Sequence, residues 1–251
     1  MVHFVGAGPG APDLITLRGK ALIEQADVII YAGSLVNPAL LNYAGPACLI
    51  RSSADMTLEE VISLMEEAHH QGKTIVRLHT GDPSVYGAIR EQIDLLRKKG
   101  IPFDVVPGVS SFCGAAAALR AEYTLPGVSQ SVILTRLAGR TPVPEQESIK
   151  SLATHGASMV VFLSAGMLPE LQEELLQGGY REDTPAAIVY KATWPEEKVL
   201  TGTVGTLAEI GAEQGIEKTA LVLVGGFLGE QYQRSKLYDP SFSHSFRRKQ
   251  P

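Results

Sequence analysis

Three segments of the chain combine glycine with polar side chains, and each follows a short apolar run. They are GAGPGAPD at residues 6–13, TGDPSVYG at 80–87 and PGVSS at 107–111. Glycine lets the backbone approach a ligand closely. In the second segment Asp82 stands between Gly81 and Pro83. Its carboxylate could bind an amino group or a ribose hydroxyl, or it could simply cap the helix expected after it.

The first segment fits the G-x-G-x-x-G/A pattern of dinucleotide-binding loops. Its context argues against that use, because Pro9 and Pro12 have no N–H to offer a pyrophosphate and Asp13 adds a negative charge. The expected second strand ends at Tyr31 with no carboxylate after it to bind a ribose. We therefore expect a ligand loop of another kind. A nicotinamide-dependent oxidoreductase and a turn without a ligand remain as alternatives.

The elements around these loops predict an α/β fold. Apolar runs at 2–5, 28–31, 74–78 and 103–106 read as strands, and helical spacing is found at 16–25, 37–43, 57–71, 84–99 and 110–119. Thr57 and Glu60 form a capping-box pattern, and Gly72 is placed to end that helix. Strands that alternate with helices indicate a parallel sheet, which binds ligands at the carboxyl ends of its strands. The three loops are expected at that edge.

The second half begins again after LPGVSQ at 125–130 with a different order of elements. Strands are expected at 131–136, 158–163, 186–190, 198–203 and 220–224, and helices at 168–177 and 206–214. We predict an N-terminal α/β domain over 1–125, a C-terminal α/β domain over 126–228 and a polar, basic tail over 229–251.

Composition narrows the classes of partner. The chain has 251 residues and a net charge of −5, so there is no basic excess that would favour nucleic acid. No apolar run approaches the roughly 20 residues that span a bilayer, and no signal peptide is seen at the start, so we expect no membrane partner and a cytoplasmic location. Cys48 and Cys113 lack metal-ligand spacing and are expected in the core; no metal site is predicted.

Longer stretches of the chain resemble a known family. GAGPGAPDLITLRGKALIEQADVIIY, RLHTGDPSVYGAIREQ and VPGVSSFCGAAAAL resemble the tetrapyrrole (corrin and sirohaem) methyltransferases, which use S-adenosylmethionine and release S-adenosylhomocysteine. QSVILTRLAGRTPVPE and IVYKATWPEEKV are similar to the subgroup that methylates C-11 of precorrin-4 or cobalt-precorrin-4 in cobalamin biosynthesis. The resemblance implies two α/β domains with the cofactor in the cleft between them, and a homodimer.

The resemblance also implies which residues hold the cofactor. By motif position they are Pro9, Thr80, Gly81, Asp82, Val85, Tyr86, Ser110, Ser111, Leu163, Ser164, Ala192 and Ala220. Thr80 stands where many relatives have glycine.

The chemistry of methyl transfer indicates what the protein must supply. A sulfonium methyl group is already activated, so catalysis is expected to come from positioning, with Asp82 orienting the cofactor and no general base assigned. The substrate would be an anionic tetrapyrrole, and the cationic side chains expected to bind its carboxylates are His79, Arg136, Arg140 and Lys191. Tyr190 and Trp194 are expected to pack rather than stack on a ring. A methyltransferase for another ring position and a non-catalytic tetrapyrrole carrier remain as alternatives.

Overall fold

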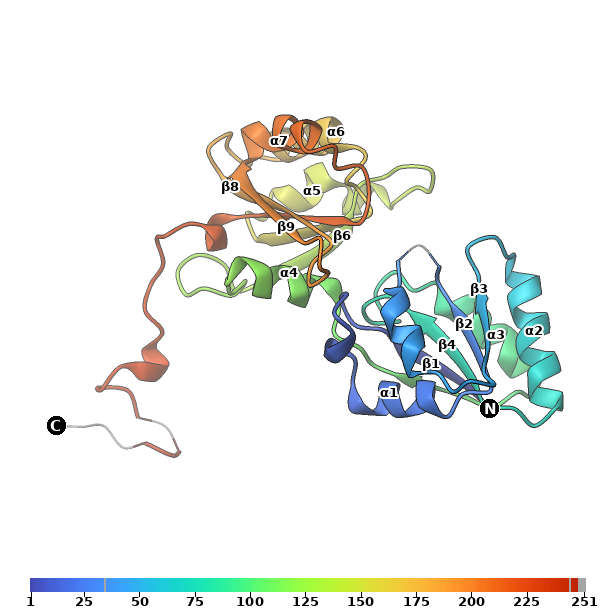
Figure 1. Ribbon diagram of the computed structural model, residues 1–251. Helices are drawn as coiled ribbons and strands as arrows, with labels where there is room; N and C mark the ends of the chain where they lie inside the picture. Colours follow the sequence, from blue (N-terminus) through green and yellow to red (C-terminus); the bar gives the residue numbers. More distant parts are fainter. Residues whose placement is uncertain (34, 244, 248–251) are drawn as a thin grey trace. The chain divides into compact units, whose positions relative to one another are not determined.

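The computed structural model describes residues 1–33, 35–243 and 245–247 (Figure 1). The chain divides into two compact units. The first contains residues 1–115 together with 191–197, and the second contains 116–190 and 198–251. The division falls inside the helix Ser111–Leu119, and a short segment from the second half of the chain groups with the first unit.

The first unit is built on a five-stranded parallel sheet in the order β3-β2-β4-β1-β5. Its strands are β1 (Val2–Gly6), β2 (Val28–Tyr31), β3 (Leu49–Ser52), β4 (Ile75–His79) and β5 (Phe103–Val106). β1, β2 and β4 are apolar along most of their length because both faces of the sheet are covered. The strand β3 is an addition to the sequence prediction, which had left 49–52 unassigned.

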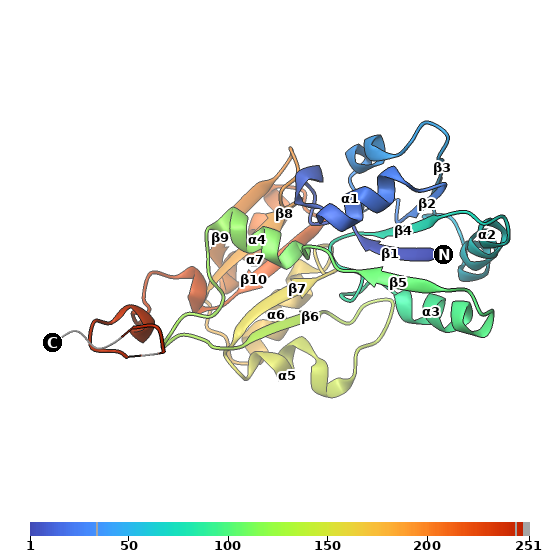
Figure 2. The same ribbon diagram turned by 90° about the horizontal axis from the view of Figure 1, so that it is seen from below.

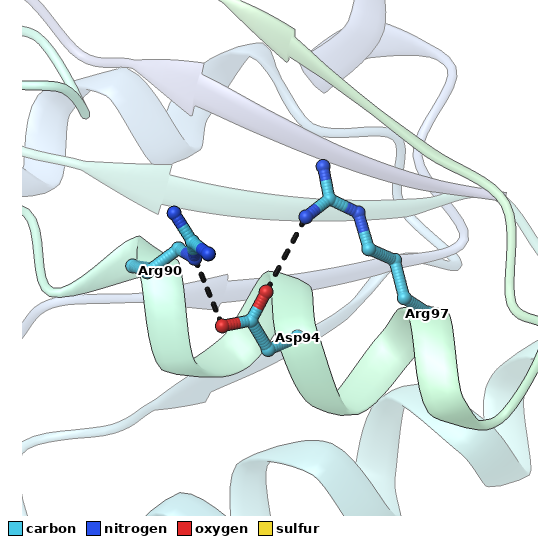
Figure 3. Close-up of polar contacts among 3 residues, drawn as sticks. All are labelled: Arg90, Asp94 and Arg97. Carbon is cyan, nitrogen blue, oxygen red and sulfur yellow. Dashed lines mark hydrogen bonds and ion pairs between the residues drawn. The ribbon is translucent and has the colours of Figure 1, made fainter.

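Helices cover the two faces of this sheet. α1 (Leu17–Glu24) lies on one face, and α2 (Leu58–His70) and α3 (Ile89–Lys98) lie on the other (Figure 2). The predicted capping box of α2 is present, with Thr57 N donating to Glu60 Oε2 at 2.7 Å and Glu60 N donating to Thr57 Oγ1 at 3.3 Å. On the exposed side of α3, Asp94 accepts from Arg90 at 2.8 Å and from Arg97 at 3.3 Å (Figure 3). Residues Pro38–Tyr43, expected as a helix, form a 3₁₀ helix.

The second unit is built on a mixed sheet in the order β6-β7-β10-β8-β9. Its strands are β6 (Val132–Arg136), β7 (Ser158–Phe162), β8 (Pro185–Tyr190), β9 (Lys198–Thr203) and β10 (Ala220–Val224), and only β6 and β7 pair in parallel. α5 (Ile149–Ala153), α6 (Leu168–Gln177) and α7 (Leu207–Glu213) pack their apolar side chains on one face of this sheet (Figure 1).

Two expectations about single elements are wrong. The helix expected over 84–99 begins only at Ile89, because Tyr86 and Ala88 adopt left-handed backbone angles of 55° and 48° in φ. Cys113, expected in the core, lies exposed on α4 (Ser111–Leu119), and Cys48 is only half-buried. Within the described part of the chain, no helix combines the length and the apolarity that crossing a bilayer requires.

Candidate functional site

The three glycine-containing loops meet at the carboxyl edge of the first sheet. They follow β1, β4 and β5, which are adjacent strands in the order β4-β1-β5. Gly8 and Gly81 form an antiparallel bridge, with Gly81 N donating to Gly8 O at 2.9 Å and Gly8 N donating to Gly81 O at 3.2 Å. The order of the strands therefore confirms the sequence prediction that the three loops share one edge, and backbone hydrogen bonds join the first two of them.

Glycine is required here because the loops pack backbone against backbone. A Cβ at Gly6 would lie 2.6 Å from Gly108 Cα and 2.7 Å from Gly81 O. A Cβ at Gly108 would lie 2.8 Å from Gly6 Cα and would overlap Gly81 O. Gly6, Gly81 and Gly108, one from each loop, are therefore in mutual contact, and the absence of a side chain at Gly6 and Gly108 allows the loops to pack this closely.

The hydrogen bonds of the first loop argue against a dinucleotide. Ala7 N donates to His79 O at 2.7 Å, Gly8 N to Gly81 O at 3.2 Å and Ala11 N to Thr193 Oγ1 at 2.9 Å. Pro9 and Pro12 have no N–H to offer. Most of the donors that a pyrophosphate cradle would use are absent or already bonded within the protein.

Asp82 connects the second and third loops. Its Oδ2 accepts from Gly108 N at 2.8 Å, and its Oδ1 accepts from Ser84 N at 2.8 Å and from the Ser84 hydroxyl. Partial burial alone would raise the pKa of Asp82, but the hydrogen bonds from Ser84 and Gly108 outweigh it and hold that pKa below its usual value. Asp82 does not cap α3, whose N-cap residue is Ala88.

The other predicted cofactor residues of the first unit belong to these loops, except Ala192, which follows β8. Tyr86 is 45% exposed with a φ of 55°, and Val85 N donates to Asp82 O at 3.2 Å. Ser110 is buried, and its carbonyl accepts from Gly114 N at the start of α4. Pro9 and Ala192 are also buried, whereas Thr80 and Ser111 are half-buried.

Two of the predicted substrate-binding residues also belong to the first unit. Lys191 Nζ lies 3.3 Å from Glu196 Oε1 and 5.1 Å from the centre of the Trp194 ring. His79 is 4% exposed, and its ring stacks on Phe4 with 6.0 Å between ring centres. Among the described residues, its Nε2 has no hydrogen-bond partner. Burial, with the neighbouring Arg77 charge as a smaller cause, lowers the pKa of His79 to about 3, so the ring is neutral near pH 7.

The remaining predicted residues lie in the second unit. Leu163, directly after β7, is 60% exposed. Its φ of 55° is uncommon for a residue other than glycine. Ser164 is fully buried, and its hydroxyl accepts from Leu137 N at 2.9 Å and donates to Phe162 O at 2.7 Å. Ala220 is buried in β10 opposite Tyr190.

Arg136 and Arg140 have different surroundings. The Arg136 guanidinium donates to the carbonyls of Leu137, Thr141 and Pro142 at 3.4, 3.1 and 2.7 Å, so it organises the turn that follows β6. Arg140 lies in that turn with its side chain exposed. No three His, Cys, Asp or Glu side chains come together as metal ligands in the described ranges.

Strained backbone is found at some of the predicted site positions and also at Ala88, Arg120 and Thr219. Tyr86, Leu163, Lys191 and Thr193 all have positive φ values, between 47° and 68°. The first three are predicted site residues and Thr193 follows Ala192. Such conformations cost energy and tend to cluster at ligand sites. Thr193, Trp194 and Asn37, which also contact the first loop, were not singled out as site residues by sequence, since their roles depend on pairing over long chain distances.

The comparisons with known proteins identify the family. The model for Tetrapyrrole (Corrin/Porphyrin) Methylases matches residues 1–208. The chain therefore belongs to the tetrapyrrole (corrin/porphyrin) methylases.

Relatives from several branches cover nearly the whole chain. A protein of Methanocaldococcus jannaschii named cobalt-precorrin-4 C(11)-methyltransferase is 54% identical, covering 98% of this chain and 96% of its own. A Pseudomonas aeruginosa protein named precorrin-4 C(11)-methyltransferase is 45% identical, with 98% of each chain covered. A Priestia megaterium uroporphyrinogen-III C-methyltransferase is 35% identical over 89% of this chain and 96% of its own.

Solved structures agree with the sequence relatives. A cobalt precorrin-4 methyltransferase superimposes with a TM-score of 0.89 at 46% identity, covering 91% of this chain and 96% of the other. A uroporphyrin-III C-methyltransferase from Thermus thermophilus, complexed with S-adenosylhomocysteine, has a TM-score of 0.74 at 26% identity, covering 90% and 92%. The predicted fold class, two α/β domains of the tetrapyrrole methylase type, is confirmed.

Proposed function

We propose that this protein transfers a methyl group from S-adenosylmethionine to C-11 of precorrin-4 or cobalt-precorrin-4 in cobalamin biosynthesis. The observation that carries the proposal is the 54% identity over 98% of the chain to a relative named for that reaction. The uroporphyrinogen-III methyltransferase is less similar, at 35% identity, so methyl transfer to another ring position is the less well supported alternative.

The residues around the glycine loops fit a cofactor of this kind. Most main-chain donors of the first loop are absent or engaged within the protein, and the loop bonded to it at Gly8 and Gly81 carries the carboxylate of Asp82. A carboxylate suits a ligand with a positive sulfonium and an amino group, and would repel a pyrophosphate. This arrangement supports S-adenosylmethionine over a nicotinamide dinucleotide.

The mechanism rests on placement of the two reactants. S-adenosylmethionine supplies an activated methyl group that needs no further electrophilic catalyst. The loops of the first unit would hold it through Pro9, Thr80, Gly81, Val85, Tyr86, Ser110, Ser111 and Ala192, and Asp82 would orient it by fixing the second and third loops to each other. We propose Leu163, Ser164 and Ala220 of the second unit as further cofactor contacts.

Substrate recognition is proposed to depend on side chains that can reach carboxylates. Arg140 is the exposed cation of the turn after β6, and Arg136 shapes that turn. Lys191 would add a second positive charge. The neutral, buried His79 would contribute a hydrogen bond rather than an ion pair. A homodimer and a cytoplasmic location stay predictions, and the first is testable by sedimentation of the purified protein.

The deciding experiment follows the product. The purified protein is incubated with S-adenosylmethionine and a precorrin-4 preparation, with and without cobalt. We expect one added methyl group by mass spectrometry, at C-11 by NMR. A methyl group at another carbon would indicate a sibling activity, and tight macrocycle binding without any methylated product would indicate a carrier.

A further inference from the structure

Three side chains from distant parts of the sequence hold the backbone of residues 9–11. Trp194 Nε1 donates to Pro9 O at 3.2 Å, and Asn37 Nδ2 donates to Gly10 O at 2.9 Å. Ala11 N donates to Thr193 Oγ1 at 2.9 Å. This loop has little regular structure of its own, so these side chains satisfy main-chain groups that a helix or sheet would otherwise pair.

The contact is also closely packed. A Cβ at Gly10 would overlap the Trp194 ring and lie 2.8 Å from Ala192 O. A Cβ at Gly114 would lie 2.8 Å from Pro9 Cβ and 3.2 Å from Thr193 Cγ2, so Pro9 and Thr193 pack on the same point of α4. A displacement of Thr193 or Trp194 would therefore also displace Pro9.

The segment that carries these side chains is itself fixed. Thr193 has a φ of 68°, a strained value for a β-branched residue, and its N–H donates to Glu197 Oε2 at 2.6 Å. Trp194 N donates to Lys191 O at 2.9 Å. Strain of this kind persists only where the surroundings determine the conformation. It presents Thr193 and Trp194 to the loop in one arrangement.

We propose that Thr193, Trp194 and Asn37 are positioning residues for the cofactor site. They hold the Pro9–Ala11 backbone, and Thr193 and Trp194 also fix the neighbouring Ala192, without touching the cofactor themselves. The proposal rests on the proposed function, since Pro9 and Ala192 are cofactor contacts there. Residues 191–194 (KATW) would thus support the cofactor loop through hydrogen bonds, in addition to the packing expected of Trp194.

The test compares two threonines that make the same kind of bond. Thr184 Oγ1 accepts from Arg181 N at 3.1 Å in the second unit, so Thr184→Val is a matched control for Thr193→Val. S-adenosylhomocysteine binding is measured by calorimetry. The bond stabilises the loop arrangement that is proposed to bind the cofactor, so its loss in Thr193→Val should lower the population of that arrangement, and with it the affinity, by about fivefold. Thr184→Val is expected to stay within about twofold of wild type.

Further variants separate positioning from general stability. Thr193→Ser keeps the hydroxyl and is expected to restore affinity, and Trp194→Phe keeps a ring but removes the donor to Pro9. In kinetics, KM for S-adenosylmethionine should rise in Thr193→Val, while kcat at saturating cofactor and the KM of the tetrapyrrole stay near wild type. Equal affinity in Thr193→Val and Thr184→Val, or no rescue by Thr193→Ser, overturns the proposal. Failure of the wild-type protein to bind S-adenosylhomocysteine overturns the proposed function as well, and is seen before any variant is made.

Discussion

The Asp82 carboxylate ties one glycine loop to another by accepting a hydrogen bond from Gly108 N at 2.8 Å. Its other oxygen closes a local Asp-Pro-Ser turn through Ser84 N. The same three residue types recur at 239–241, where Asp239 Oδ1 accepts from Ser241 N at 2.8 Å and from Ser241 Oγ at 2.7 Å. The two turns share their local bonds, and the bond to Gly108 distinguishes the first.

Replacing Asp82 by alanine should therefore weaken cofactor binding more than it weakens the fold. Loss of a charge-assisted hydrogen bond between loops is expected to reduce S-adenosylhomocysteine affinity about tenfold. The free energy of unfolding should fall by only about 1 kcal/mol, because Asp82 is partly exposed. Calorimetric titration and urea denaturation measure the two quantities.

Asp239→Ala is the control for this prediction, since it removes the same local turn without a bond between loops. Its cofactor affinity should equal that of wild type. Unchanged affinity in Asp82→Ala would show that the loops keep their arrangement without the carboxylate.

The low pKa of His79 predicts that the folded protein loses stability as the pH falls below about 6.5. Burial, helped by Arg77, lowers this pKa to about 3, below the ordinary 6.5. Between those pH values the unfolded chain binds a proton at this position and the folded chain does not. Stability therefore falls as pH drops from about 6.5 toward 3, by up to about 1.4 kcal/mol per pH unit from this residue.

His79→Leu should remove that contribution. Urea denaturation between pH 6.5 and 4.5 should give a smaller loss of unfolding free energy for His79→Leu than for wild type. His155→Leu, at an exposed position, should keep the wild-type pH dependence. If wild type and His79→Leu lose stability in parallel, His79 takes up its proton over the same pH range in the folded and the unfolded protein, and its burial has no effect on stability.

Local patterns predicted much of the first unit. Val28–Tyr31 and Phe103–Val106 coincide with the observed strands, and Thr57 with Glu60 forms the expected cap. These features depend on neighbouring residues, where apolar spacing and capping chemistry determine the outcome. The expected edge for the three loops followed from the parallel order of the strands.

Features that depend on long-range contacts were missed. Pro83 and the apolar spacing after it indicated a helix from Ser84, but Asp82 is bonded to Ser84 and to the distant Gly108, and the left-handed Tyr86 and Ala88 delay the helix to Ile89. The contact of Trp194 with Pro9 joins residues far apart in the chain. The burial of His79 beside Arg77 likewise arises only when the helices cover the sheet.

The contact between Gly6, Gly81 and Gly108 predicts that one methyl group is enough to disturb the site. Gly108→Ala should lower the free energy of unfolding by about 1–3 kcal/mol, since its Cβ would meet backbone atoms that cannot turn aside. Cofactor affinity should fall with it. Gly45→Ala is the matched control, because its Cβ would have only Glu24 O within reach, at 3.8 Å. Similar stabilities for the two variants in urea denaturation would contradict the close packing of the loops.

The two arginines around the turn after β6 should give different kinetic defects. Arg140→Ala removes an exposed charge, so the KM of the tetrapyrrole should rise up to about tenfold while cofactor affinity stays unchanged.

Arg136→Ala removes three hydrogen bonds to the carbonyls of Leu137, Thr141 and Pro142, and should loosen the turn as well. We expect faster proteolysis between residues 137 and 142 in Arg136→Ala only. Arg181→Ala, which breaks an exposed ion pair with Asp183 elsewhere in the second unit, should change neither KM. A loss of cofactor affinity in Arg140→Ala would exclude Arg140 from substrate binding and assign it to the cofactor.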